Sequence, residues 1–422
     1  MIHLIYLAIS IICLIFAIWL YYRYFELFLC LLIVINFDFF RLLPPLGKFY
    51  AYRELLLPIL AFCIVERFFF SKKKFELGRY GILVLFFLIM AFFGIVNAFW
   101  HGQPLILGVK AAKYFPLILI YFVVVNKEFD IDKFLKYLVL LSFLVSIVML
   151  VQFFLWGKFY FVHFTLKELG KMRLGRPRII VGGNLIALVG VISLGMFLKQ
   201  KRFIYLLAYL YSFVYTVYLT QTRMLIFAML ICGVLLFILN LNTTSKVVSA
   251  IIVALCFAVP CGFVAFKYIR QIGVVKLTEL DIKKKRGSFE ARIRALKYYF
   301  NEIKKSPILG HGLINYNWEK SPFRVLQNRN IYLSDIGITS LLYKFGLMGG
   351  IWLILCVFMV FRDILKNRDA CLDVGAYFLF IISVMATLDF FIKNDKIFLL
   401  GLFLGLLTTL INRHTLQSYN EA

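Results

Sequence analysis

Charged residues are scarce in this 422-residue chain, and acidic ones are the scarcest. Asp and Glu together number 21 against 47 Lys and Arg, and the four types make up 16% of the residues. Soluble domains are about a quarter charged and about half apolar, whereas this chain is 63% hydrophobic with a mean hydropathy of +0.90. A water-soluble core cannot hide this much apolar surface, so the composition excludes a soluble globular protein and indicates a membrane protein.

The sequence also lacks paired cysteines, metal-ligand spacing and internal repeats. Its eight cysteines stand almost all in apolar runs, without the spacing of disulfide or zinc sites, so we expect them to serve packing. His101, His163 and His311 have no ligand spacing to another His, Cys or carboxylate, so neither a metal nor another cofactor is predicted. The absence of a repeat argues against transporter folds built from two related halves.

Long apolar runs fill the chain instead, and a spanning helix needs about 20 such residues. Met1–Tyr22 has neither a basic start nor a small-residue cleavage site, so we interpret it as a retained helix rather than a signal peptide. We predict an all-α polytopic membrane protein with about 12–13 transmembrane helices. The predicted helices lie at 2–21, 24–38, 53–70, 79–98, 104–125, 134–156, 180–198, 203–220, 224–241, 247–266, 334–361, 374–391 and 396–412.

The distribution of Lys and Arg among the short loops predicts the orientation. Seventeen of these residues fall on one side and six on the other, and the richer side is expected to be cytoplasmic. The N-terminus and both long loops then lie outside and the C-terminus inside. The predicted organisation is N-terminal transmembrane helices (1–156), a basic outside loop (157–179), central helices (180–266), a long basic outside loop (267–333), and C-terminal helices with a cytoplasmic tail (334–422).

Both long loops are basic, with six basic residues against one acidic residue in 157–179 and fifteen against five in 267–333. A net charge of +26 is compatible with nucleic acid, lipid headgroups or an anionic substrate. The outside placement argues against nucleic acid and favours the other two. The longer loop is partly helical, because Ser288 can cap a helix that runs to about Lys305. Its predicted apolar face, with Arg292 at the edge, consists of Ile293, Leu296, Tyr299, Phe300 and Ile303.

Arginines gather on the predicted outer side, at Arg176, Arg178, Arg223 and Arg292. A guanidinium group stays charged and matches phosphate oxygens with two parallel hydrogen bonds. Several of them at one vestibule would hold a pyrophosphate and stabilise it as a leaving group, although arginines at a membrane edge also extend towards lipid headgroups. The same two interpretations apply to Lys110 and Lys113, which share one face of an apolar helix.

Two residues on the predicted outer side, Asp335 and His311, each have a functional and a structural interpretation. Asp335 could be a general base that deprotonates a sugar hydroxyl. Asp335 begins a predicted spanning helix, where an aspartate equally fits a helix cap. His311 stands between two glycines in a turn, where it could shape the backbone or contact a substrate. Both interpretations stay open for each residue.

The order of several short segments resembles the core of the O-antigen ligase and O-antigen polymerase superfamily. Thr222-Arg223-Met224 resembles its Ser-Arg helix start, and Arg178 with Gly183-Asn184 resembles its upstream Arg and Asn element. The resemblance spans roughly residues 170–355. Its other segments are Ala291-Arg292-Ile293, Ser306-Pro307-Ile308-Leu309-Gly310-His311-Gly312, Tyr332-Leu333-Ser334-Asp335-Ile336-Gly337 and Lys344-Phe345-Gly346-Leu347-Met348-Gly349-Gly350.

The resemblance implies a membrane-embedded, metal-independent, inverting glycosyltransferase. Such an enzyme joins a glycan on undecaprenyl pyrophosphate to an acceptor sugar at the outer membrane face. Arg223 and Arg292 would hold the pyrophosphate, with Arg178 as a third contact. Membrane lipid and a chain-length regulator are the other partners that the resemblance implies.

One departure from the superfamily bears on the reaction. Its ligases have a histidine at the start of the helix after the long loop, where this chain has Asn328-Arg329-Asn330 and then Ser334-Asp335. This resembles the polymerase branch, so we predict a repeat-unit polymerase for O-antigen, capsule or exopolysaccharide in a bacterial inner membrane. The alternatives are an O-antigen ligase that acts on lipid A–core and a lipid-linked oligosaccharide flippase. The predicted order for the base is Asp335, then His311, then Glu290.

Overall fold

The structure is a computed structural model that describes residues 2–43, 52–70, 74–164, 172–173, 176–240, 288–328, 331–333, 336–385 and 394–420. Within these ranges the only strands are β1 (Met172–Arg173) and β2 (Arg176–Pro177), which pair antiparallel. The predicted all-α membrane fold is confirmed, because seven helices in the described part of the chain are long and apolar enough to cross a membrane. They are Gly81–Trp100, Leu105–Val125, Ile131–Phe154, Gly183–Gln200, Phe203–Thr220, Ile338–Lys366 and Asp395–Leu416.

The N-terminal third of the chain forms short and long helices. Pro116 divides the predicted helix 104–125 into α5, η4 and α6, because proline lacks the amide hydrogen that a helix interior needs. The elements are α1 (Ile2–Arg23), α2 (Phe25–Asn36), η1 (Asp38–Arg41), η2 (Tyr52–Leu55), α3 (Leu56–Val65), η3 (Glu66–Phe70), α4 (Gly81–Trp100), α5 (Leu105–Ala112), η4 (Phe115–Leu119), α6 (Ile120–Val125) and α7 (Ile131–Phe154).

The central helix α9 (Gly183–Gln200) is buried on nearly all sides, against α7, α10 (Phe203–Tyr215), α11 (Arg223–Leu239) and α17 (Arg368–Val384). Glycines permit these close contacts. A Cβ at Gly195 would lie 2.8 Å from the Cα of Asp373. The predicted helix 247–266 lies outside the described residues.

The C-terminal third consists of α14 (Ser288–Lys305), α15 (Pro322–Asn328), α16 (Ile338–Lys366), α17 and α18 (Asn394–Asn420). The predicted boundaries 334–361 and 374–391 are wrong, because the chain turns at Asn367 and α17 begins at Arg368. The charged residues of this stretch lie inside the helices. Asp363 is buried against Arg79 and Tyr80, and Asp373 accepts a hydrogen bond from Lys199 Nζ at 3.0 Å. Since these partners offset the cost of burying charge, the helices continue past the expected break.

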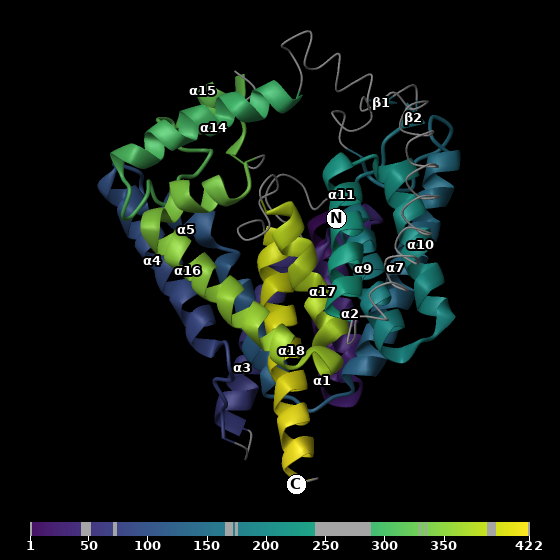
Figure 1. Cartoon of the computed structure of the whole chain (residues 1–422). Helices are drawn as coiled ribbons and strands as arrows, with labels where there is room; N and C mark the ends of the chain where they lie inside the picture. Colours follow the sequence, from purple (N-terminus) through teal and green to yellow (C-terminus); the bar gives the residue numbers. More distant parts are fainter. Residues whose placement is uncertain are drawn as a thin grey trace.

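The described parts of both long loops lie at one end of the molecule (Figure 1). The hairpin β1–β2 belongs to loop 157–179, and α14 and α15 belong to loop 267–333. The C-terminal end of α18 lies at the opposite end (Figure 1). We call these the outer end and the inner end, after the orientation that the loop charges predict.

Candidate functional site

Arg178 and Arg223 lie close together at the outer end. Arg178 directly follows β2, and Arg223 is the first residue of α11. The Nε of Arg178 donates to the carbonyl oxygen of Thr220 at 2.8 Å, and its Nη2 donates to Thr222 Oγ1 at 2.9 Å. Burial lowers the pKa of Arg178, and the nearby charge of Arg223 lowers it further. Two guanidinium groups held this close form a positive site whose mutual repulsion a bound polyanion would relieve.

An unusual backbone turn brings the two arginines together. Thr216–Thr220 forms the π-helical turn η5, and Gln221 then takes a left-handed conformation with φ of 49°. Both features are uncommon in ordinary helices and concentrate at functional sites. The amide of Ile179 donates to the carbonyl of Leu219 at 3.1 Å, so the segment that contains Arg178 runs along this turn.

Gly182 and Gly183, at the start of α9, allow the same close approach. A Cβ at Gly183 would lie 2.0 Å from Thr220 Cγ2, so any side chain at this position would force Thr220 to move. Gly182 has a φ of 70°, which glycine adopts without strain. Gly182-Gly183 and Thr220-Gln221-Thr222-Arg223 therefore form one packed unit.

The amphipathic helix α14 has the predicted extent, but its buried face differs from the expected one. Ala295 and Tyr299 are buried, whereas Ile293 and Phe300 are 37% and 50% exposed. The sequence placed Arg292 at the edge of the apolar face. In the structure Arg292 lies on the same face of α14 as Ala295 and Tyr299, which follow it by three and seven residues in the sequence. Its Nε is buried without a hydrogen-bond partner in the described part of the chain.

The turn at Gly310-His311-Gly312 interlocks with a break in α16. Gly346 has φ 56° and ψ −142° inside this helix, and a Cβ there would lie 2.5 Å from the carbonyl carbon of Ile308. The amides of His311 and Gly312 donate to the carbonyls of Tyr343 and Lys344 at 2.8 and 3.0 Å. Two segments of the superfamily resemblance are therefore the two sides of a single backbone contact.

Helix α4 holds this turn from the other side. The amide of Leu313 donates to the carbonyl of Gly94 at 2.8 Å, and the Asn97 side chain donates to the carbonyl of Gly310 at 2.7 Å. Asn97 is 6% exposed in an otherwise apolar helix. A buried amide stabilises only where it finds such partners, so its bond fixes the turn relative to α4.

The ring of His311 is held in a defined orientation. It stacks on Tyr343 with 4.7 Å between ring centroids, and its Nε2 lies 2.9 Å from the carbonyl oxygen of Glu302. A carbonyl can only accept a hydrogen bond, so in the neutral ring Nε2 holds the proton and Nδ1 keeps its lone pair. The ring of His101 lies 5.9 Å away. His311 thus presents a proton-accepting nitrogen at the outer end.

The remaining predicted site residues have varied placements. Lys110 is exposed on α5, and Lys113 forms a 2.5 Å ion pair with Glu54. Glu290 lies in the first turn of α14 and Arg176 in β2. Asp335 lies outside the described residues. Helix α5 lies on the α4–α16 side of the molecule and α9–α11 on the other (Figure 1). The structure therefore separates the two lysines from the arginine pair. The His311 turn, which contacts α4 and α16, lies on the same side as the lysines.

Residues 206–354 match a family model described as O-antigen ligase. The chain contains an O-antigen ligase-family domain. This confirms the resemblance to the O-antigen polymerase and ligase superfamily that the sequence predicts over roughly 170–355. The search of curated proteins found no match. Members of this family are glycosyltransferase-like enzymes that act as polymerases or ligases.

The ligase-family domain includes Arg223, Arg292 and His311, whereas Arg178 lies upstream of it. The arginine pair therefore combines a residue of this domain with one that directly follows the upstream hairpin. The structure also shows positioning residues that sequence reasoning missed, namely Asn97, Glu302 and Tyr343. Asn97 leaves a signal in the sequence, because it is the sole amide in an apolar span. The other two leave none, since Glu302 acts through its backbone carbonyl and Tyr343 through its ring face.

Proposed function

We propose that the chain is a polymerase that joins undecaprenyl-pyrophosphate-linked repeat units of a surface polysaccharide at the outer face of a bacterial inner membrane. The observation that carries the proposal is the arginine pair. Arg178 and Arg223 come from different segments, and neutral oxygens of Thr220 and Thr222 fix Arg178 at the outer end. Rigid, partly desolvated guanidinium groups suit a pyrophosphate better than a single charge.

An apolar groove beside the arginine pair supports a lipid-linked donor. It is a cavity of about 670 Å³ between α7 and α10–η5, and Leu219 at its end directly precedes Thr220, which binds Arg178. A lipid chain in this groove would place its phosphates near the two guanidinium groups. The lining residues are Leu150, Phe153, Phe154, Tyr211, Val214, Tyr215, Tyr218 and Leu219.

The reaction needs a base opposite the leaving group. The acceptor hydroxyl forms a new bond to the anomeric carbon while the bond from that carbon to the phosphate oxygen breaks. The hydroxyl proton goes to the base, and the arginines stabilise the pyrophosphate that leaves. Asp335, His311 and Glu290 are the proposed bases. The hydrogen bond from His311 Nε2 to the carbonyl of Glu302 supports this role for His311, because it leaves the Nδ1 lone pair to accept a proton.

Replacing His311 with glutamine tests this role. A glutamine amide can keep a donor towards the Glu302 carbonyl but removes the basic nitrogen, so we expect polymerisation to fall by about 100-fold or more. The measurement is the ladder of glycan chain lengths from cells, with protein amount as a second readout. Tyr343→Phe keeps the stacked ring and should retain the ladder. A normal ladder from H311Q would transfer the role to Asp335 or Glu290.

Deletion of the gene separates the candidate functions. Loss of a polymerase leaves single repeat units on the final acceptor, whereas loss of a ligase leaves long polymer that is not attached to lipid A–core. Loss of a flippase would leave lipid-linked units on the cytoplasmic face. We expect single repeats, restored to a ladder by the wild-type gene. A chain-length regulator is the proposed protein partner, by analogy with the family.

A further inference from the structure

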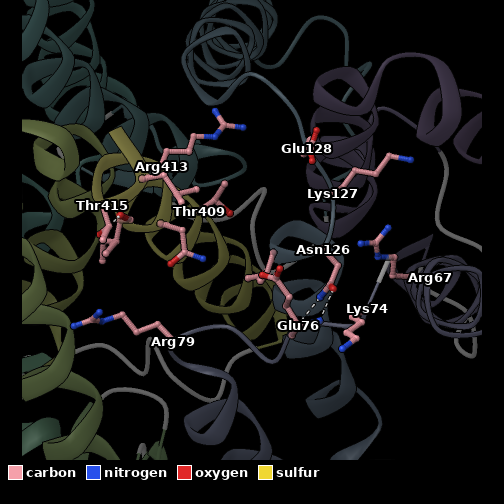
Figure 2. A pocket seen from close by; sticks show the side chains of 14 residues that line it. Arg67, Lys74, Glu76, Arg79, Asn126, Lys127, Glu128, Thr409, Arg413 and Thr415 are labelled. Carbon is pink, nitrogen blue, oxygen red and sulfur yellow. Dashed lines mark hydrogen bonds between the residues drawn. The ribbon is translucent and has the colours of Figure 1, made fainter. Parts of the chain in front are cut away.

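A second basic site lies at the inner end, far from the arginine pair. It is a cavity of about 990 Å³ between α18, the segment before α4, and the turn between α6 and α7. Figure 2 shows Arg413 and Thr409 of α18 on one side, with Arg67 and Lys74 across from them. We call it the inner pocket. Its lining residues are Arg67, Lys74, Glu76, Arg79, Val125, Asn126, Lys127, Glu128, Thr409, Ile411, Asn412, Arg413, Thr415 and Leu416.

The charge of the inner pocket is strongly unbalanced. Five basic side chains line it, Arg67, Lys74, Arg79, Lys127 and Arg413, against two acidic ones, Glu76 and Glu128. Arg79 is paired with the buried Asp363 of α16 through Nε and Nη2. The other four basic residues still outnumber the two acids, so the cavity is positive.

Hydrogen bonds hold the walls of the inner pocket in place. The amide of Glu76 donates to Asn126 Oδ1 at 2.8 Å, and Asn126 Nδ2 donates to the carbonyl of Glu76 at 2.8 Å (Figure 2). Arg413 Nη2 donates to the carbonyl of Phe129 at 2.5 Å. These bonds join residues that stand 50 and 284 positions apart. The pocket is therefore built by the fold rather than formed by one basic loop.

Lys127 lies partly within the protein at the rim of the inner pocket. Its Nζ stands 4.3 Å from the ring centroid of Tyr21. Burial lowers the pKa of Lys127. Glu66 and Cys63 oppose this shift, and the nearby charge of Arg67 adds to it. A basic group whose affinity for a proton is lowered by burial and a nearby positive charge gains from a bound anion.

We propose that the inner pocket binds a phosphate-bearing anion at the cytoplasmic face of the membrane. The cation-rich wall fits phosphate oxygens, and the hydroxyl and amide groups of Thr409, Asn412 and Thr415 can add neutral hydrogen bonds. A membrane phospholipid headgroup and a soluble phosphate compound share this chemistry. The preference for basic residues on the inner side of membrane proteins explains basic loops in general. It does not explain why separate segments direct them to one cavity.

Basic residues elsewhere on the inner side provide a matched control. Lys136, Lys201 and Arg202 are exposed and do not line the inner pocket. The triple variants R67Q/K74Q/R413Q and K136Q/K201Q/R202Q remove the same number of positive charges. The full chain, purified in detergent, is titrated with phosphatidylglycerol, phosphatidylcholine and inorganic pyrophosphate, and binding is followed by native mass spectrometry and thermal shift.

We expect the pocket variant to bind phosphatidylglycerol at least about tenfold more weakly than wild type, because each basic residue near a phosphate contributes about a fivefold factor. The control variant should keep wild-type affinity. Competition by pyrophosphate would assign the site to soluble phosphates as well, and binding of phosphatidylglycerol alone would assign it to a lipid headgroup. Equal losses in both variants, or no preference of the wild type for either anion over phosphatidylcholine, would overturn the proposal.

Because Arg413 also holds the carbonyl of Phe129, its replacement alone could disturb the fold. The double variant R67Q/K74Q keeps that bond. It should still weaken binding severalfold while its melting temperature without ligand stays at the wild-type value. Unchanged affinity in this stable double variant would also contradict the proposal.

Discussion

Cells whose only copy of the gene encodes Arg223→Ala should make single-repeat glycan and no ladder of longer chains. Arg223 stands beside Arg178, where a pyrophosphate would lose one of two guanidinium partners. Removing one donor that stabilises a developing anion typically costs about 100- to 1000-fold in rate, which is enough to abolish a ladder. The measurement is the electrophoretic pattern of surface polysaccharide, normalised to the amount of protein in the membrane.

Two further variants separate this effect from a general loss of charge. Arg223→Lys keeps the charge but loses the planar pair of donors, so we expect a short, faint ladder. Arg324→Ala removes an exposed arginine at the same end, one that donates to the carbonyls of Tyr316 and Asn317, and should leave the ladder intact. A normal ladder from R223A at normal expression would refute the proposed role of the arginine pair.

The second large effect is expected at the break in α16. Gly346→Ala would place a Cβ 2.5 Å from the carbonyl carbon and oxygen of Ile308 and 2.6 Å from the amide nitrogen of Gly310. All three are backbone atoms that cannot rotate away, and φ 56° with ψ −142° is itself strained for alanine. Strain and overpacking together should cost about 2–6 kcal/mol. We expect little folded protein, measured by size-exclusion chromatography and thermal unfolding in detergent.

Gly350→Ala, one turn further along α16, is the matched control. A Cβ there would meet only the Cδ2 of Leu342 at 3.2 Å, which is the end of a flexible side chain. Alanine also favours a helix over glycine by about 1 kcal/mol. We expect wild-type yield and equal or higher thermal stability. If G346A and G350A behaved alike, the interlock of the His311 turn with α16 would not determine stability.

Apolar length predicted most of the fold, because a membrane-spanning helix needs little more than a continuous apolar run. Breaks within the helices were less visible. The kink at Gly346 and the turn at Asn367 depend on tertiary partners, such as the backbone of Ile308 and the ion pair of Asp363 with Arg79. Local sequence does not contain those partners, so the predicted boundaries between 334 and 391 were wrong.

In the candidate site, too, the residues could be predicted from the sequence but their tertiary contacts could not. The sequence singled out Arg178, Arg223, Arg292 and His311 from residue chemistry and family resemblance. Arg292 was predicted at the edge of the apolar face of α14 because that face was defined by large apolar residues alone, without Ala295. A small residue at helical spacing marks the buried side equally well, since it lets α14 approach α16 closely. The bonds from Arg178 to Thr220 and Thr222 depend on the left-handed Gln221, which no propensity predicts.

The two parts of the proposed site differ in when they can form during synthesis. The bonds of Arg178 reach residues only 42 and 44 positions away, so that half can assemble once α11 has left the ribosome. The His311 turn must instead find Gly94 and Asn97 of α4, a helix made more than 200 residues earlier. Because chains fold from the N-terminus as they emerge, the pyrophosphate half would mature first. The growing chain would gain its proton acceptor only after the part of α16 up to Gly346 has been inserted.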